Sequence, residues 1–391
     1  MRRVVLLCIS VYFVHGTLEP LTKEEKKKGK EKKEQRPILK TVGERGLINT
    51  EPTSWAEVTK NYKKYSRNHV DKKMFKGDLL GFVTPWNNHG YDVAKTFGAK
   101  FNYISPVWLQ IVPTTQGTFK IKGGHDIDAG WVRDVRANNT NVKIAPRLIF
   151  GEWSMAHLTQ VTSSEGELMH LVQVVVEFFK GEKFDGVVLE IWRQFQGREK
   201  PRLHQIIKAI SEGMSEGQMT TQLVIPPGVR PFPEIFDKYD FQILQPYIEK
   251  FVMMTYDHHH GTGKAGPVGP MDWGLRNILL IMEHENNDNY RHKLLYGVNF
   301  YGADFRGDGH FDAIVGSQYI DLLKSAKPSQ FSWHLKASEL SFEYRDNKQI
   351  HKVFYPSLRF IQKRVEAAER FKIGIAIWEI GQGLDYFFDL L

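Results

Sequence analysis

Short apolar runs alternate with longer amphipathic segments from Asp78 to Leu391. The apolar runs predict eight strands, at Leu79–Thr84, Phe101–Val107, Val142–Ile149, Asp185–Ile191, Leu223–Ile225, Phe251–Tyr256, Leu294–Phe300 and Ile373–Trp378. The intervening segments predict helices such as Tyr91–Gly98, Gly166–Lys180, Pro201–Gly213, Phe232–Ile248, Met271–Glu285 and Ser357–Phe371. Such alternation is typical of βαβ units, and eight strands over about 310 residues favour an α/β fold of the (β/α)8 TIM-barrel type over a doubly wound sheet.

Two segments depart from this alternation. Between the last two strands, Leu340–Tyr344 and Val353–Tyr355 predict a hairpin across Arg345-Asp346-Asn347, which would form a small appendage beside the barrel. Before the barrel, residues 52–77 predict a helical lead-in, because aromatic and apolar residues recur there every three or four positions. We expect this lead-in to dock on the bottom or side of the barrel.

The first 51 residues predict a signal peptide and a basic leader. Arg2 and Arg3 precede a short apolar run, so residues 1–16 read as a signal peptide rather than a membrane span. Cys8, the only cysteine, lies in this segment, and the mature chain would therefore have no disulfide. Asn138-Asn139-Thr140 is a sequon, so secretion would make Asn138 an N-glycosylation candidate.

The formal net charge of +8 comes mostly from the start of the chain. Residues 17–40 hold nine Lys or Arg against five Glu, while the rest of the mature chain is nearly balanced. We therefore expect no nucleic-acid partner, and residues 17–51 read as a solvated disordered leader. An alternative is that this leader attracts anionic surfaces such as lipopolysaccharide, phospholipid or sulfated glycans.

The stretch from Phe184 to Trp192 is a strand that is apolar on both faces yet carries Asp185 and Glu190. Burying a carboxylate costs several kcal/mol unless it is hydrogen-bonded or ion-paired. These two residues therefore predict a polar site, although a purely structural carboxylate is the alternative.

Aromatic residues end seven of the eight predicted strands. In a (β/α)8 barrel the site lies at the strand ends. Pyranose rings have apolar C–H faces and polar edges, so indoles with carboxylates beside them suit a glycan, whereas core packing is the alternative for each residue alone. The predicted carbohydrate-binding residues are Trp86, Trp108, Trp153, Glu190, Trp192, Tyr256, Asp257, Tyr301, Trp378 and Glu379.

Several of these segments resemble glycoside hydrolase family 18. The fourth strand resembles its motif Asp-x-x-Asp-x-Asp-x-Glu, with Asp185 at the first aspartate, Val188 at the second, Glu190 at the third and Trp192 at the catalytic glutamate. Further similarity lies in Met254-Thr255-Tyr256-Asp257, in Gly297–Gly302, and in Gly374 with Trp378, whereas Pro146-Arg147 and Gly151-Glu152 depart from the third-strand pattern. The resemblance implies that Tyr256 and Asp257 hold an N-acetyl sugar and that Trp378 floors the central subsite.

The replacement at Trp192 predicts that the chain is not an enzyme, because an indole cannot act as a general acid. The chain most resembles a chitinase-like lectin branch of the family. That resemblance implies a secreted or lysosomal protein that binds N-acetylglucosamine oligosaccharides and lipopolysaccharide, has a stabilin-1-type endocytic receptor as partner, and serves innate pathogen sensing.

Two competing hypotheses stay open. The first is a weak glycosidase with a relocated acid, for which Glu190, Asp257 and Glu379 are candidates. The second is a scaffold whose aromatic residues bind protein partners. We expect no cofactor and no metal, since His258-His259-His260 reads as a hydrogen-bonded loop.

Overall fold

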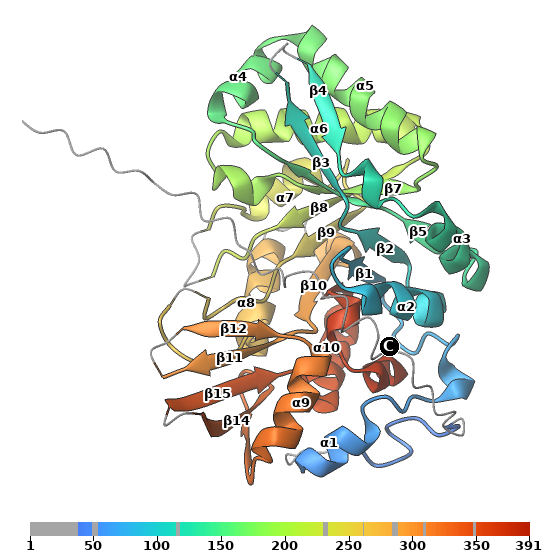
Figure 1. Cartoon of the computed structure of the whole chain (residues 1–391). Coiled ribbons are helices and arrows are strands. Elements are labelled where there is room, and N and C mark those ends of the chain that lie inside the picture. Colours follow the sequence, from blue (N-terminus) through green and yellow to red (C-terminus); the bar gives the residue numbers. More distant parts are fainter. Residues whose placement is uncertain are drawn as a thin grey trace, which may run out of the picture.

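The computed structural model describes residues 38–48, 54–114, 118–229, 234–260, 262–283, 288–307, 310–346 and 349–391 (Figure 1). The predicted signal peptide and most of the predicted leader lie outside these residues. Within the described part, no helix is long and apolar enough to cross a bilayer.

Eight parallel strands close into the predicted barrel. They are β1 (Leu79–Val83), β2 (Tyr103–Pro106), β5 (Lys143–Ile144) continued by β6 (Arg147–Phe150), β7 (Gly186–Glu190), β8 (Thr220–Ile225), β9 (Lys250–Met253), β10 (Leu294–Asn299) and β16 (Gly374–Trp378). The closing pair is β1 with β16, and β5 and β6 together form the third barrel strand. Ala145 and Pro146 join these halves, because Ala145 N–H donates to Ile104 O and Pro146 O accepts from Val188 N–H. The predicted strands are thus confirmed.

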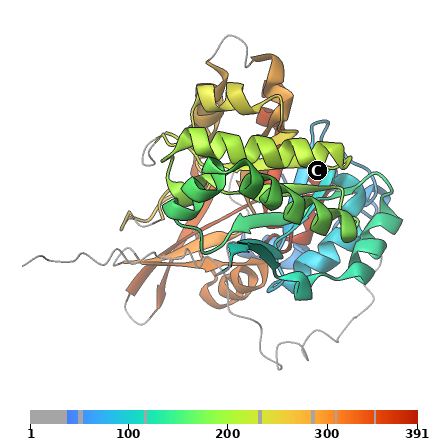
Figure 2. The same ribbon diagram turned by 90° about the horizontal axis from the view of Figure 1, so that it is seen from above.

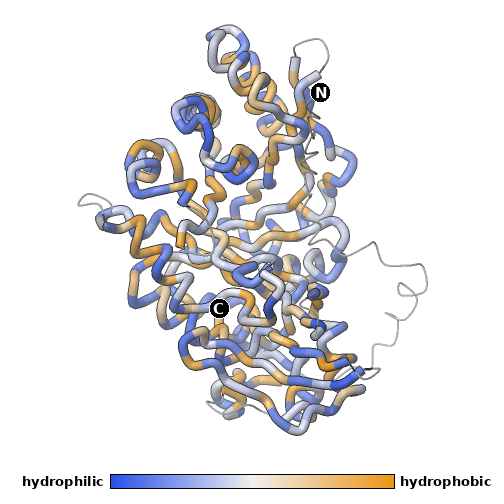
Figure 3. Tube along the Cα trace, turned by 90° about the vertical axis from the view of Figure 1, so that its left-hand side faces the viewer, coloured by the Kyte–Doolittle hydropathy of each residue, from blue (hydrophilic) through white to orange (hydrophobic). Residues whose placement is uncertain are grey.

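The barrel strands are apolar on both faces because each face packs in a different core. One cluster fills the barrel interior and takes residues from every barrel strand, including Leu80, Phe82, Val188 and Ala376. A larger cluster lies between the strands and the helices. In Figure 3 the helices alternate hydrophobic and hydrophilic segments along their turns, as expected when one side of each helix packs on the sheet.

The helices surround the sheet (Figure 2). They are α2 (Asn88–Phe97), α3 (Ala129–Asn138), α4 (Met155–Ser163), α5 (Glu165–Gly181), α6 (Lys200–Glu216), α7 (Lys238–Leu244), α8 (Met271–Met282), α9 (Gly316–Ala326) and α10 (Leu358–Phe371). Helix α7 is shorter than predicted because Asp237 caps it, accepting hydrogen bonds from the Tyr239 and Asp240 N–H groups.

Two β structures extend the barrel beyond what the sequence predicted. The appendage is an antiparallel sheet in the order β12 (Phe311–Ile314), β11 (Gly302–Arg306), β15 (Gln349–Tyr355), β14 (Glu339–Asp346) and β13 (Phe331–His334), of which only the β14–β15 hairpin was predicted. The predicted turn is partly wrong, since β14 includes Arg345 and Asp346, and Asn347 lies outside the described residues. A second hairpin, β3 (Leu109–Pro113) with β4 (Phe119–Lys122), adds to the sheet edge at β6.

The lead-in is less helical than predicted. Helix α1 covers only Trp55–Asn61, and a 3-10 turn follows at Arg67–His69. Asp389 near the end of the chain fixes this region together with the end of the predicted leader. Its two oxygens accept hydrogen bonds from the Ser66 N–H group of the lead-in at 2.8 Å and from the N–H group of the buried leader residue Val42 at 3.0 Å. The lead-in therefore packs against the C-terminal segment.

Candidate functional site

The carboxyl ends of β9 and β10 bring two buried tyrosines and an aspartate together. Tyr256 and Asp257 follow β9, and Tyr301 follows the adjacent β10. The Tyr301 hydroxyl donates to Asp257 Oδ1, and the Tyr256 and Tyr301 rings meet edge-on with centroids 6.3 Å apart. Burial first, and the Asp257 charge second, raise the pKa of both phenols well above the ordinary value. Both hydroxyls therefore stay protonated. The Tyr301 hydroxyl donates its proton to Asp257, so the Tyr256 hydroxyl is the one that can donate a hydrogen bond to a ligand.

Trp378 ends β16 where the barrel interior meets the appended sheet. Its ring packs on Phe82 with centroids 5.1 Å apart and also against the cluster that contains Tyr256 and Tyr301. Trp86, beyond the end of β1, packs against the interior cluster, and its buried Nε1 has no hydrogen-bond partner among the described residues. We call the region around Tyr256, Tyr301 and Trp378 the barrel mouth. Half-buried indoles and buried polar groups suit a pyranose there.

Glu190 brings a carboxylate to the barrel mouth. It is the last residue of β7 and lies on the same strand face as Val188, which packs in the barrel interior. Its carboxylate pairs with Arg147 of β6 at 2.8 Å, and its side chain is 23% exposed. The Arg147 guanidinium lies 5.5 Å from the centre of the Trp378 ring. The Glu190 charge helps to raise the pKa of Tyr256, after burial and the Asp257 charge. Glu190, Arg147, Tyr256 and Trp378 therefore share one site.

Trp192 lies elsewhere, contrary to the expectation that it occupies the catalytic position in the groove. Strand β7 ends at Glu190, Ile191 has a ψ of −34°, and a 3-10 helix begins at Trp192. The indole is fully buried in the outer core, where its Nε1 donates to Ile235 O at 2.7 Å and its ring meets Phe236 edge-on. The expected position required the strand pleat to continue, and the 3-10 turn instead directs Trp192 away from the mouth.

Trp108 and Trp153 also depart from the expected groove. Trp108 is buried in the outer core, and its Nε1 donates to the Tyr91 hydroxyl at 2.7 Å. Trp153 donates to Ile111 O at 3.1 Å and stacks on Phe119 of β4. Neither indole continues the pleat of its strand, because β2 ends at Pro106, before Trp108, and β6 ends at Phe150, before Trp153. These two indoles are structural parts of the outer core.

Glu379 is buried behind the barrel mouth and does not line it. Its carboxylate accepts hydrogen bonds from the Asn87 amide and, at 2.9 Å, from the Gly381 N–H group. Burial raises its pKa to about 7, although both hydrogen bonds oppose that rise. Because the side chain is fully enclosed, it cannot reach a glycosidic oxygen. The expectation that Glu379 contacts the edge of the glycan is therefore corrected.

The histidine loop after Asp257 is held by hydrogen bonds. His258 Nδ1 lies 3.0 Å from His259 Nδ1, which lies 2.9 Å from Pro267 O. Burial, with His259 second, lowers the pKa of His258 to about 4. Across the described part of the chain, no group of three or more His, Cys, Asp or Glu side chains could hold a metal ion.

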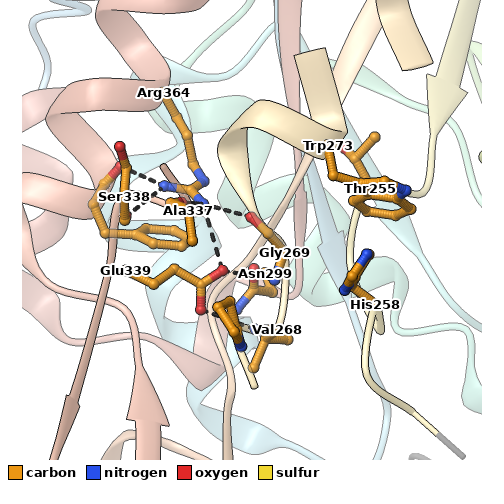
Figure 4. A network of polar contacts seen from close by, with 12 residues as sticks. Thr255, His258, Val268, Gly269, Trp273, Asn299, Ala337, Ser338, Glu339 and Arg364 are labelled. Atoms are coloured by element: carbon orange, nitrogen blue, oxygen red, sulfur yellow. Dashed lines mark hydrogen bonds and ion pairs between the residues drawn. The ribbon is translucent and has the colours of Figure 1, made fainter. Parts of the chain in front are cut away.

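A buried ion pair fixes the far end of this loop (Figure 4). Glu339 of β14 accepts hydrogen bonds from the Val268 and Gly269 N–H groups at 2.9 and 2.7 Å. Arg364 of α10 lies 3.7 Å from Glu339 and donates to Gly269 O at 2.6 Å. Since the His258 N–H group donates to Val268 O at 2.9 Å, the appended sheet and α10 together position the segment that carries Tyr256 and Asp257.

The sequence reasoning missed Glu339, Arg364 and Arg147 as site-supporting residues. The signal for Arg147 was present, because Pro146-Arg147 departs from the family pattern in the third strand. Asn138 ends α3 and is exposed, with its amide donating to Lys95 O at 2.6 Å. Its glycosylation stays a prediction.

Proteins of known sequence and structure are similar to this chain. A 152-residue segment, 38% of the chain, is 25% identical to the uncharacterized glycosylase YvbX of Bacillus subtilis (strain 168) and spans 43% of that protein. A chitinase from Chromobacterium violaceum superposes with a TM-score of 0.68 at 16% identity, over 80% of this chain and 98% of that one. A chitinase from Cycas revoluta, solved in complex with (GlcNAc)3, superposes with a TM-score of 0.64 at 14% identity over the same shares. At these identities the structural matches show the fold.

These relatives overturn the expectation that the chain is not an enzyme. They are named a glycosylase and chitinases, and the model of a family of hydrolases matches residues 79–383. The structure removes the basis of that expectation, because Trp192 lies outside the mouth while the Glu190 carboxylate lies in it. None of the matches described above shows the narrower chitinase-like lectin branch. The matched residues cover most of the chain, which therefore belongs to the glycosyl hydrolases family 18.

Proposed function

We propose that this protein binds oligosaccharides of β-linked N-acetylglucosamine at the barrel mouth and hydrolyses them. The observation that carries the proposal is the convergence of Tyr256, Asp257, Tyr301 and Trp378 beside Glu190. The Cycas revoluta chitinase, which has the same fold, was solved with (GlcNAc)3, and this supports the sugar assigned here.

Each group at the mouth has a binding role suited to an N-acetyl sugar. The Tyr256 phenol, kept protonated by burial, donates a hydrogen bond to the acyl oxygen or to a sugar hydroxyl, while the Tyr301 phenol holds Asp257, which accepts from the amide N–H. Trp378 offers an indole face to the apolar side of the ring.

Glu190 is the group to which we assign proton transfer. In substrate-assisted hydrolysis, the acyl oxygen of the substrate bonds to C1 as the C1–O bond breaks, and an acid gives its proton to the leaving oxygen. Water then opens the cyclic intermediate and returns a proton to the carboxylate. Glu190 is partly exposed at the mouth, whereas Glu379 is enclosed and Asp257 accepts the Tyr301 hydroxyl. The Arg147 ion pair must yield as Glu190 takes up a proton.

Titration with N-acetylglucosamine oligomers tests both parts, with tryptophan fluorescence following binding and chromatography following products. Glu190→Gln should lower the cleavage rate by roughly 100-fold or more, the usual contribution of a general acid, while binding persists. The control is Glu152→Gln, which changes another ion-paired glutamate, bonded to the exposed Lys122 at 2.7 Å. Binding without cleavage by the unmodified protein would refute hydrolysis, and no binding would favour the protein-scaffold hypothesis.

Other expectations from the sequence stay predictions. They are lipopolysaccharide as a ligand, a stabilin-1-type receptor as a partner, a secreted or lysosomal location and a part in innate pathogen sensing. The Lys-rich leader supports an anionic ligand.

A further inference from the structure

A side pocket lies at the β3–β4 hairpin and is lined by residues of that hairpin, of α4 and of the first turn of α5. Its cavity volume is about 370 Å³, at the low end of the range of small-molecule sites. The residues that line it include Thr118, Phe119, His157, Gln160 and Glu167. None of the barrel-mouth residues lines this cavity, so it is a separate feature of the molecule.

Glu167 gives this pocket an unused acceptor. Its Oε1 accepts a hydrogen bond from the Gln160 amide at 3.1 Å. Its Oε2 is shielded from water and has no hydrogen-bond partner among the described residues. A buried carboxylate oxygen without a hydrogen-bond donor destabilises the folded state. A ligand that donates a hydrogen bond to Oε2 would remove that destabilisation.

The rest of the pocket has an aromatic wall and hydroxyl groups. Phe119 stacks on the buried Trp153, with centroids 5.5 Å apart and planes 11° apart, so the phenyl ring is held in one orientation. The Thr114 and Thr118 hydroxyls lie 2.7 Å apart, and either can donate to the other. An ammonium ligand only donates, whereas a sugar hydroxyl both donates and accepts and so can use these groups as well as Glu167.

We propose that the side pocket is a second carbohydrate site that takes one pyranose unit. The C–H face of the sugar packs on Phe119, and a ring hydroxyl donates to Glu167 Oε2 after a rotation of the Glu167 side chain turns that oxygen toward the cavity. Gln160 holds the other carboxylate oxygen and thereby sets the direction of Oε2. The site is independent of the barrel mouth and of hydrolysis there.

Fluorine NMR of the full chain labelled with 5-fluorotryptophan tests this proposal. The Trp153 resonance, assigned with Trp153→Phe, reports the side pocket because the indole stacks behind Phe119. The Trp378 resonance, assigned with Trp378→Phe, reports the barrel mouth separately. The probes are N-acetylglucosamine and its β-1,4-linked disaccharide. We expect saturable shifts at Trp153 and, in Glu167→Gln, binding there weakened by roughly tenfold, the usual effect of losing a hydrogen bond to a charged group.

The matched control is Glu177→Gln on the same helix. Glu177 also accepts from a glutamine amide, that of Gln173 at 2.8 Å, but it is exposed and away from the pocket. Binding at Trp153 should be unchanged in this variant. The proposal is overturned if Trp153 does not respond up to the solubility limit of both sugars, or if Glu167→Gln responds like the unmodified protein. Because Trp378 is read independently, failure of binding at the mouth leaves this result interpretable.

Discussion

The two halves of the barrel rim use aromatic residues at strand ends in opposite ways. After β9, β10 and β16, the residues Tyr256, Tyr301 and Trp378 meet at the barrel mouth. After β2, β6 and β7, the indoles of Trp108, Trp153 and Trp192 pack in the outer core. The residue types are alike, so the direction of the backbone as it leaves each strand decides whether an aromatic ring faces a ligand or a helix.

The largest effect that tests this contrast is on stability. Trp192→Ala should lower the free energy of unfolding by about 3–5 kcal/mol, because it removes a fully buried indole and leaves Ile235 O without its donor. Affinity of the folded variant for N-acetylglucosamine oligomers should not change. Urea unfolding and a sugar titration measure the two quantities. A large loss of affinity with normal stability would place Trp192 in the mouth after all.

The path of Trp192 shows where sequence reasoning stops. Apolar runs that suit a strand buried on both faces were enough to predict the eight barrel strands, because this pattern is local. The turn of Trp192 away from Glu190 depends on the backbone at Ile191 and on an acceptor at Ile235, 43 residues later. Likewise, Glu339 bonds Val268 and Gly269 about 70 positions away, and no local pattern carries that information.

A second test concerns the pH dependence of stability at Glu379, the acidic neighbour of Trp378. Its pKa is about 7 in the folded chain against 4.5 ordinarily, so its protonation stabilises the folded state below about pH 4.5. This contribution, about 3 kcal/mol for the shift, is lost as the pH rises through 7. The lowered pKa of His258 makes the free energy of unfolding rise with pH instead. Both Glu379→Gln and the unmodified chain contain His258, so this contribution cancels in their difference. We therefore expect the difference in unfolding free energy between Glu379→Gln and the unmodified chain to change by up to that amount between pH 4.5 and 8.

Urea unfolding of both proteins across this pH range measures the difference. A difference that does not vary with pH would mean that Glu379 is hydrated like a residue of the open mouth. That result would place Glu379 at the barrel mouth, among the residues that face a ligand.

The third test is the counterpart of the first. Trp378→Ala should weaken binding of N-acetylglucosamine oligomers by about 1–3 kcal/mol, the usual range for an aromatic anchor. Its stability loss should be smaller than that of Trp192→Ala, because Trp378 is only partly buried. Calorimetric titration gives the affinity. Unchanged affinity would mean that Trp378 does not contact the sugar at the barrel mouth. The aromatic residues of the two halves of the rim would then not differ in ligand binding.

The smallest expected effect isolates a single hydroxyl. Tyr301→Phe keeps the ring at the mouth but removes the hydrogen bond to Asp257, so sugar affinity should fall by about 1 kcal/mol. Tyr344→Phe is the matched control, since its hydroxyl donates to Asp304 at 2.6 Å on the appended sheet, away from the mouth. The control should lose similar stability with no change in affinity. Equal loss of affinity in both variants would mean that the appended sheet acts on the mouth as a whole. A loss confined to Tyr301→Phe shows that the Tyr301 phenol must orient Asp257 before the carboxylate can accept a hydrogen bond from the sugar amide.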